Sequence, residues 1–82
     1  MKTMLITGTC KSGQTDGFIL YDIWIWGQTY KTPDITLVRP VTKLFKDYTE
    51  MINFCKVFFC EYFNTDDNNL TILDHITIIW KK

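Results

Sequence analysis

The stretch of residues 8–15 nearly spells a phosphate-binding loop. It reads GTCKSGQT, whereas the P-loop pattern is G-x-x-x-x-G-K-[ST], so Gln14 stands where the pattern needs Lys. A working loop also needs a helix that starts at its end, because the free N–H groups and the dipole of that helix hold the anion. Here Asp16-Gly17, a strong turn signal, is followed by a strand-like run. The sequence therefore predicts a hairpin turn between two strands and no nucleotide site.

The thiols and the histidine are the other residues that could do chemistry. A nucleophilic site would need Cys10, Cys55 or Cys60 beside His75, the only histidine, together with an orienting carboxylate. Asp74 cannot form a dyad with His75, because neighbours in a strand point to opposite faces. Cys55 and Cys60 are five positions apart, which is not a spacing typical of zinc ligands. We therefore predict no catalytic residue, no metal site and no cofactor, unless the cysteines and His75 converge in space.

The segment FILYDIWIW, residues 18–26, is the most distinctive in the chain. Strand alternation gives it one row of Ile19, Tyr21, Ile23 and Ile25, and a second row of Phe18, Leu20, Asp22, Trp24 and Trp26. We expect the aliphatic row to be buried, because a carboxylate is costly to bury without a partner. The second row then lies on an outer face, unless the sheet curls or a loop covers it.

Large rigid rings on an uncovered face indicate an interaction surface, since Trp and Tyr are over-represented among interface hot spots. The surface is predicted to bind a partner protein or a second copy of the chain. The candidate partner-binding residues are Asp22, Trp24, Trp26, Tyr30, Lys31 and Arg39.

The elements that position these residues follow from the hydrophobic pattern. Strands are expected over residues 4–7, 18–27, 35–39 and 70–80, the third being stopped by Pro40. A helix is expected from an N-cap at Thr42 to about Phe63, with Tyr48 and Tyr62 on its apolar stripe. The order β-β-β-α-β predicts an α+β fold in a single domain, residues 1–82. Its sheet is four-stranded and mostly antiparallel, with one long amphipathic helix on one face.

Composition narrows the classes of function. The net charge is zero, with nine basic and nine acidic residues, which disfavours a dedicated binder of duplex nucleic acid. Hydrophobic residues make up 46% of the chain and aromatic residues 16%. We expect one small core to be unable to bury all of them, which favours an exposed interaction surface. No apolar run is long enough to span a bilayer and no signal segment is visible, so we expect a cytoplasmic protein without membrane contact.

The same composition suggests an origin. The chain has no Ala, and eight Lys against one Arg, which is the pattern of an AT-rich gene such as those of bacteriophages and mobile elements. The resulting hypothesis is a small non-catalytic binding protein that inhibits a host protein, for example a CRISPR or other defence effector. The alternatives are a homo-oligomeric structural or accessory protein whose Trp-rich strand is its own interface, and a weak binder of single-stranded nucleic acid that uses Lys31 and Arg39 beside the rings. No small-molecule substrate is expected.

Overall fold

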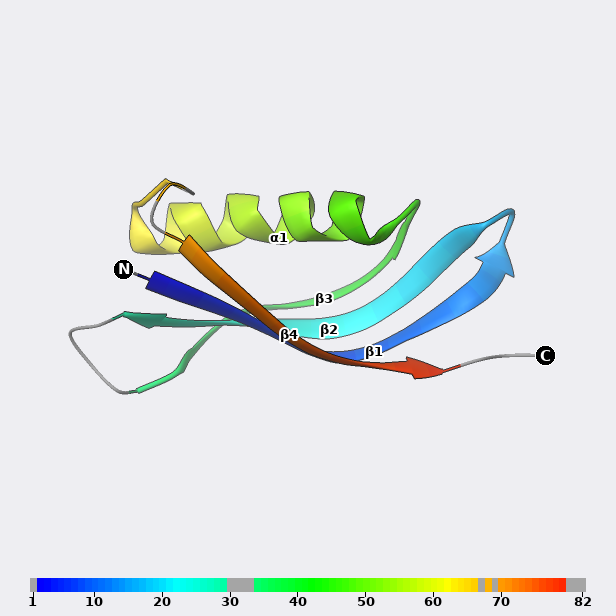
Figure 1. Ribbon diagram of the computed structural model, residues 1–82, viewed down its shortest axis with the longest axis horizontal. Helices are drawn as coiled ribbons and strands as arrows, with labels where there is room; N and C mark the ends of the chain where they lie inside the picture. The colour runs from blue at the N-terminus through cyan, green and yellow to red at the C-terminus, as the bar shows by residue number, and fades with distance from the viewer. Residues whose placement is uncertain (1, 30–33, 67, 69, 80–82) are drawn as a thin grey trace.

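The computed structural model describes residues 2–29, 34–66, 68 and 70–79. The elements in chain order are β1 (Lys2–Thr15), β2 (Phe18–Thr29), β3 (Thr36–Phe45), α1 (Tyr48–Phe63) and β4 (Leu70–Ile79). The strands form one sheet, and α1 lies on one face of it (Figure 1). The predicted α+β architecture, with four strands and one helix around a single core, is confirmed.

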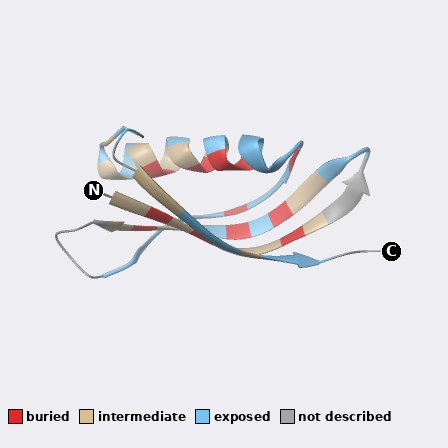
Figure 2. Cartoon of the chain, in the orientation of Figure 1, coloured by how far each residue is buried: buried red, intermediate tan, exposed pale blue. Residues whose placement is uncertain are grey.

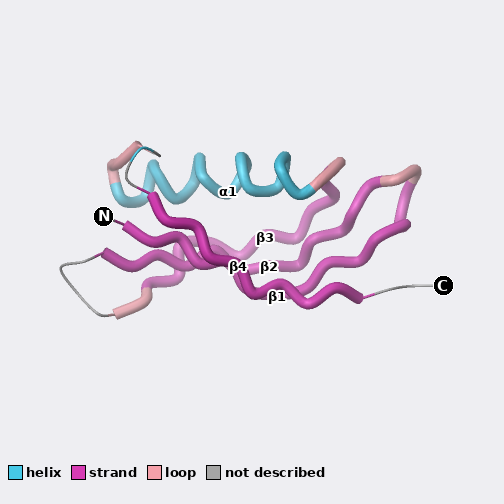
Figure 3. Tube along the Cα trace, in the orientation of Figure 1, coloured by secondary structure: helices cyan, strands magenta, loops and turns pink. Residues whose placement is uncertain are grey.

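The sheet is mixed, so the prediction that it is mostly antiparallel is wrong. β1 and β2 pair antiparallel, as do β2 and β3, but β4 lies parallel to β1. The cause is α1, which carries the chain back along the sheet, so that β3 and β4 run in the same direction (Figure 3). Since β1 is also parallel to β3, β4 has to be parallel to whichever edge strand it joins. It joins β1, which gives the spatial order β3-β2-β1-β4.

The stretch that resembles a phosphate loop lies in the β1–β2 hairpin. β1 continues to Thr15, with a register irregularity after Lys11, and the chain reverses at Asp16-Gly17. Both turn residues have positive φ, 46° and 85°, as a two-residue turn of the primed type requires. The predicted turn is confirmed, and it is tighter than expected because β1 extends into the polar segment. A strand follows the turn, so no helix N-terminus is there to hold a phosphate.

Helix α1 begins later than the sequence predicts, because Asp47 and not Thr42 is its N-cap. The Asp47 carboxylate accepts a hydrogen bond of 2.8 Å from the backbone N–H of Glu50. The Glu50 carboxylate in turn accepts one of 3.1 Å from the backbone N–H of Lys46. This reciprocal arrangement resembles a capping box and satisfies two N–H groups at once. The helix ends at Phe63, as predicted, and in the described residues no helix has the length and apolar character to cross a membrane.

Strand β3 passes through Pro40, where the sequence predicts that it stops. Proline is tolerated there because β3 is an edge strand, so a missing N–H leaves the ladder to β2 intact. A bulge precedes it: Ile25 and Trp26 are consecutive in β2, but they pair with Arg39 and Leu37, which leaves an extra residue in β3. The bulge decides on which face the side chains of β3 lie.

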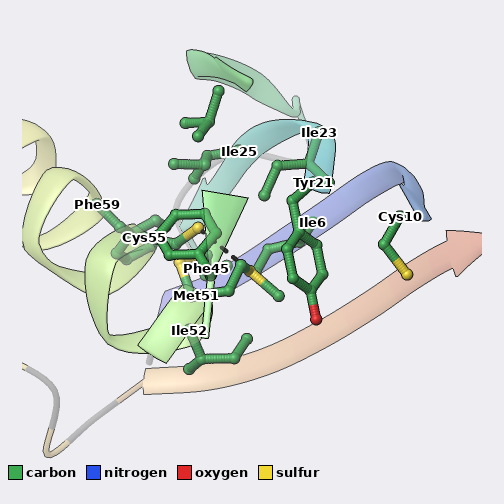
Figure 4. Close-up of a cluster of buried hydrophobic side chains, with 12 residues drawn as sticks. Ile6, Cys10, Tyr21, Ile23, Ile25, Phe45, Met51, Ile52, Cys55 and Phe59 are labelled. Carbon is green, nitrogen blue, oxygen red and sulfur yellow. Dashed lines mark hydrogen bonds between the residues drawn. The ribbon is translucent and has the colours of Figure 1, made fainter. Parts of the chain in front are cut away.

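The core lies between α1 and the sheet. Figure 2 shows buried residues on the side of α1 that faces the sheet and at alternating positions along the strands, and Figure 4 shows their side chains meeting. As predicted, Tyr21, Ile23 and Ile25 of β2 are buried, while Ile19 of the same row is only partly buried. Tyr48 and Tyr62 of the predicted helix stripe are exposed. The helix packs mainly on β2 and β3. The buried hydrophobic residues are Met4, Ile6, Cys10, Tyr21, Ile23, Ile25, Val41, Phe45, Met51, Ile52, Cys55 and Phe59.

Candidate functional site

The face of the sheet opposite α1, which we call the outer face, carries an apolar row across all four strands. Leu5 of β1 pairs with Trp26 of β2 and with Leu73 of β4, and Trp26 pairs with Leu37 of β3. Paired residues lie on the same face, and their side chains are neighbours. Leu37 and Leu73 are exposed, at 45% and 49%, and Leu5 and Trp26 are half-buried. No described element covers this row.

A second row lies directly beside the first. Trp24 pairs with Pro40 on one side and with Thr7 on the other, and Thr7 pairs with His75. Trp24 is 51% exposed, the more exposed of the two tryptophans. We call the first row together with Trp24 and Pro40 the apolar band; its members are Leu5, Trp24, Trp26, Leu37, Pro40 and Leu73.

Contacts within the sheet hold the two tryptophan rings in place. The indole Nε1 of Trp26 donates a hydrogen bond of 2.8 Å to the hydroxyl of Thr7. The rings of Trp24 and Trp26 meet edge to face, with centroids 6.4 Å apart and planes at 77°. This geometry is favourable for aromatic pairs. A ring that is already ordered loses little side-chain entropy when a partner covers it, so the pair is pre-organised for contact.

A polar row borders the apolar band. Asp22 pairs with Thr42 and with Thr9, and Thr9 pairs with Thr77. The Asp22 carboxylate accepts a hydrogen bond of 3.0 Å from the hydroxyl of Thr42. Asp22, a predicted site residue, therefore lies on the predicted face, where it forms the polar edge of the surface.

Arg39 lies away from the tryptophans, contrary to the expectation that it accompanies them. It pairs with Ile25, whose side chain is buried under α1, so Arg39 is in the helix-side row. Its guanidinium stacks over the ring of Phe58, 4.4 Å from the centroid, on α1. The bulge in β3 is responsible, because it changes which residues of β3 share a face with the tryptophans. Tyr30 and Lys31 lie outside the described residues.

The residues of a thiol enzyme are separated by the sheet. Cys10 and Cys55 are buried on the helix side, and the partly buried Cys60 lies in α1 on that same side, whereas His75 belongs to the outer face beside Thr7. Burial raises the pKa of both thiols, that of Cys55 to about 12, which disfavours the thiolate that a nucleophile needs. Among the described residues no group of three or more His, Cys, Asp or Glu side chains is placed to hold a metal ion.

A hollow of about 290 Å³ lies on the helix side, where the sheet extends beyond the start of α1. A 16-residue helix is roughly 24 Å long, while the 12 residues of β2 extend for roughly 40 Å, so one helix cannot cover the strand. At its border the hydroxyl of Tyr48 donates a hydrogen bond to the Asp74 carboxylate. This bond, more than burial, raises the pKa of Tyr48 to about 12. The lining residues are Cys10, Ile19, Tyr21, Tyr48, Asp74, Ile76 and Ile78.

The sequence does not identify the three leucines of the apolar band as surface residues that lie together. Leu5, Leu37 and Leu73 come from three different strands, and each is unremarkable in its own segment. Only the pairing register brings them beside Trp26. The alternation in β1 indicates that Leu5 lies on the face opposite Met4 and Ile6, but it does not show which strands become neighbours of β1.

The role of the apolar band has to be argued from its geometry. It consists of ordered rings and leucines on a face that no described element covers, and it is bounded by a polar row on one side. Comparison of the chain with models of known protein families, with curated proteins and with solved structures found no match.

Proposed function

We propose that this chain is a small, non-catalytic binding protein whose apolar band docks onto a partner protein. The observation that carries the proposal is the row Leu37-Trp26-Leu5-Leu73, which crosses the whole sheet beside the half-exposed ring of Trp24. Contiguous apolar patches of this kind mark interaction sites. Protein partners bury rigid aromatic anchors of this type in pockets, with a polar rim around them, and Asp22 and Thr42 supply such a rim on one side.

The distribution of cations supports a protein partner over single-stranded nucleic acid. Stacking of bases on Trp needs basic side chains alongside to neutralise the phosphates. Arg39 and Lys43, however, lie over rings on the helix side: Arg39 over Phe58, and Lys43 within 5.2 Å of the Phe54 centroid. Lys11 is on the outer face, but it pairs with Leu20, so the row of Asp22 lies between it and Trp24. The carboxylate of Asp22 lies on the same face as the tryptophans, where it would repel a phosphate backbone.

The partner that we propose is a host protein, with the chain acting as an inhibitor encoded by a bacteriophage or mobile element. The support is compositional: no Ala, eight Lys and one Arg in a chain of 82 residues. A CRISPR effector or another defence effector belongs to the class of targets that such a protein would meet. Inhibition by occupying a surface requires no catalytic group, which agrees with the burial of Cys10 and Cys55.

Affinity capture from a lysate of an AT-rich bacterial host, with identification by mass spectrometry, tests the proposal. The wild-type chain is compared with Trp24→Ala and with Tyr62→Ala, which removes an equally exposed ring from the helix layer. We expect Trp24→Ala to lose the captured partner and Tyr62→Ala to retain it. Equal capture by both variants would show that the apolar band is not the docking surface.

Sedimentation of the purified chain separates the proposal from the homo-oligomer alternative. If the band is occupied by a partner, the free chain sediments as a monomer at micromolar concentration. A dimer that dissociates on Trp24→Ala but not on Tyr62→Ala would instead make the band a self-interface, and the proposed function would be wrong.

A further inference from the structure

The two edges of the sheet differ in how they are protected against a further strand. β3 has Pro40, which offers no N–H, a bulge, and the cations Arg39 and Lys43. These are devices by which natural edge strands avoid pairing with other chains. β4 is a ten-residue strand, LTILDHITII, without Pro, Lys or Arg, and its pairing with β1 shows no irregularity. Within the described residues, no strand pairs with its outer edge.

Both faces of β4 are also poorly covered. α1 packs mainly on β2 and β3, and the hollow lined by Ile76 and Ile78 opens on the helix side of β4. Ile78 is 57% exposed on that side, and Leu73 is 49% exposed on the outer face. An added strand would place alternate side chains beside these residues on both faces. The backbone N–H and C=O groups along this edge can be paired only by another extended chain, because only such a chain offers a matching row of acceptors and donors. The partner at this edge is therefore expected to be an extended polypeptide segment.

Asp74 determines what that extended chain has to carry. It is the one charged residue on the helix side of β4, whose other helix-side positions are Leu70, Ile72, Ile76 and Ile78. The described residues give its carboxylate a single donor, the neutral hydroxyl of Tyr48. The carboxylate is exposed and borders the apolar hollow, so a cation placed opposite it would gain a charge partner.

Asp74 also disfavours pairing of this edge with β4 of a second copy of the chain. In an antiparallel pair of β4 strands about a twofold axis, the register that sets Ile72 of one copy opposite Ile76 of the other also sets the two Asp74 carboxylates against each other. Every other register of this kind in which Asp74 faces a residue of β4 places it against Leu or Ile, because the remaining helix-side positions of β4 are all aliphatic. Like charges directly opposite, or a carboxylate against an aliphatic chain, destabilise the pairing.

We infer that the outer edge of β4 accepts an extended, cation-bearing segment of a partner protein, which adds to the sheet as a fifth strand. In the antiparallel orientation a Lys or Arg lies opposite Asp74. Aliphatic side chains two and four positions away lie opposite Ile76 and Ile78 and cover the open side of the hollow. This edge borders the apolar band at Leu73, but the inference rests on the backbone of β4 and on Asp74 and does not depend on the proposed function of that band.

Binding of synthetic peptides, followed by calorimetry with the full chain, tests the inference. The probe is Thr-Ile-Thr-Ile-Thr-Lys-Thr-Ile-Thr, which matches β4 in the antiparallel register, and the control peptide has Glu in place of Lys. We expect the Lys peptide to bind about tenfold more tightly than the Glu peptide, the ratio expected when an attractive cross-strand pair replaces a repulsive one. Failure of the Lys peptide to bind, or equal affinity of both peptides, would overturn the inference.

Charge variants of the protein provide the second arm. Asp74→Asn keeps an acceptor for Tyr48 and should reduce the preference for the Lys peptide to nearly one, whereas Asp74→Lys should reverse it. Asp22→Asn makes the same chemical change on the outer face of β2 and should leave the preference unchanged. Circular dichroism and urea midpoints confirm that each variant is folded, and Asp74→Asn alone suffices if Asp74→Lys does not fold.

Two further results would contradict the inference. A preference for the Lys peptide that persists in Asp74→Asn would show that the charge of Asp74 does not select the segment. A stable dimer in sedimentation that is lost on Ile78→Lys would show that the edge is occupied by a second copy. The peptide assay is independent of Trp24, so loss of lysate capture in Trp24→Ala together with unchanged peptide affinity would identify two separate surfaces.

Discussion

The two faces of the sheet are made by the same strands and differ in what covers them. In β2 the side chains of Tyr21, Ile23 and Ile25 are at most 3% exposed under α1, while Trp24, between two of them, is 51% exposed on the outer face. The helix is a single layer of 16 residues, so it can bury one face and no more. The two tryptophans of β2 lie on the other face, and the exposed rings of Tyr48 and Tyr62 lie on α1. The helix side therefore provides the core, and the outer face is the surface for which we propose a role in recognition.

The largest expected effect comes from removing a ring from the core, and it is compared with removing a ring from the outer face. Phe59 is fully buried, and Phe59→Ala should lower the free energy of unfolding by about 3–5 kcal/mol. That is a large part of the roughly 4–12 kcal/mol expected for 82 residues. Trp24→Ala should cost about 1–2 kcal/mol, because half of the ring is already in water. Urea denaturation followed by circular dichroism measures both. Equal losses would mean that Trp24 is a structural residue, and would remove the distinction between the faces.

A smaller effect is expected at Gly8, where the backbones of β1 and β2 approach each other closely. Gly8 has φ of 134°, and a Cβ there would collide with the carbonyl oxygen of Asp22 and the Cα of Ile23 in β2. Gly8→Ala should therefore push β1 away from β2 and cost about 2–3 kcal/mol.

Gly17→Ala is the matched control for that substitution. Gly17 also has positive φ, 85°, but a Cβ there meets nothing within 4 Å. Its cost should be limited to the backbone strain, about 1 kcal/mol. Urea midpoints of the two variants give the comparison, and a cost at Gly17 as large as that at Gly8 would argue against close approach of the two strands at Gly8.

The smallest effect concerns the border of the helix side, where Tyr48 donates to Asp74. Tyr48→Phe should cost about 0.5–1 kcal/mol near pH 7, because Tyr48 is 45% exposed and solvent screens the bond. The pKa of Tyr48 in the folded chain, about 12, lies above the ordinary tyrosine value of 10.0, so the contribution of the bond is present below pH 10 and is lost as the pH rises towards 12.

Urea denaturation at pH 7, 9 and 11 checks the sign of this dependence. The difference between wild type and Tyr48→Phe should be constant from pH 7 to pH 9 and smaller at pH 11. A difference that grows with pH would contradict a bond in which the neutral hydroxyl donates to the carboxylate.

Much of this architecture follows from local patterns. The alternation in FILYDIWIW correctly separates the buried row of β2 from its outer row, because strand geometry alone assigns successive side chains to opposite faces. The turn at Asp16-Gly17 and the end of the helix at Phe63 are local as well. The start of the helix is not determined locally, since Thr42 and Asp47 are both acceptable N-caps. Thr42 is excluded as the cap because it pairs with Asp22 in the sheet and therefore belongs to β3.

The candidate surfaces depend more on long-range pairing. The exposure of Trp24 is predictable from β2, but the leucines that complete the apolar band come from three other strands. The position of Arg39 depends on one extra residue in β3, and no local signal announces that bulge. That β4 is parallel to its neighbour could have been predicted from the β-β-β-α-β order, because a helix after β3 carries the chain back towards the end of the sheet where β3 begins.

The sequence by itself determined the element types, the two rows of β2 and the excess of aromatic residues, because these depend on propensities and on contacts between near neighbours in the chain. The tertiary structure decided which strands are adjacent, and therefore that Trp26 lies between Leu37 and Leu5 and that Arg39 stacks on the helix. It also decided that β4, with Asp74 at its middle, has an edge with which no described strand pairs. These features require pairing of segments that are distant in sequence. Such pairing is selected by the packing of the whole chain, and a one-residue shift in it moves a side chain from one face of the sheet to the other.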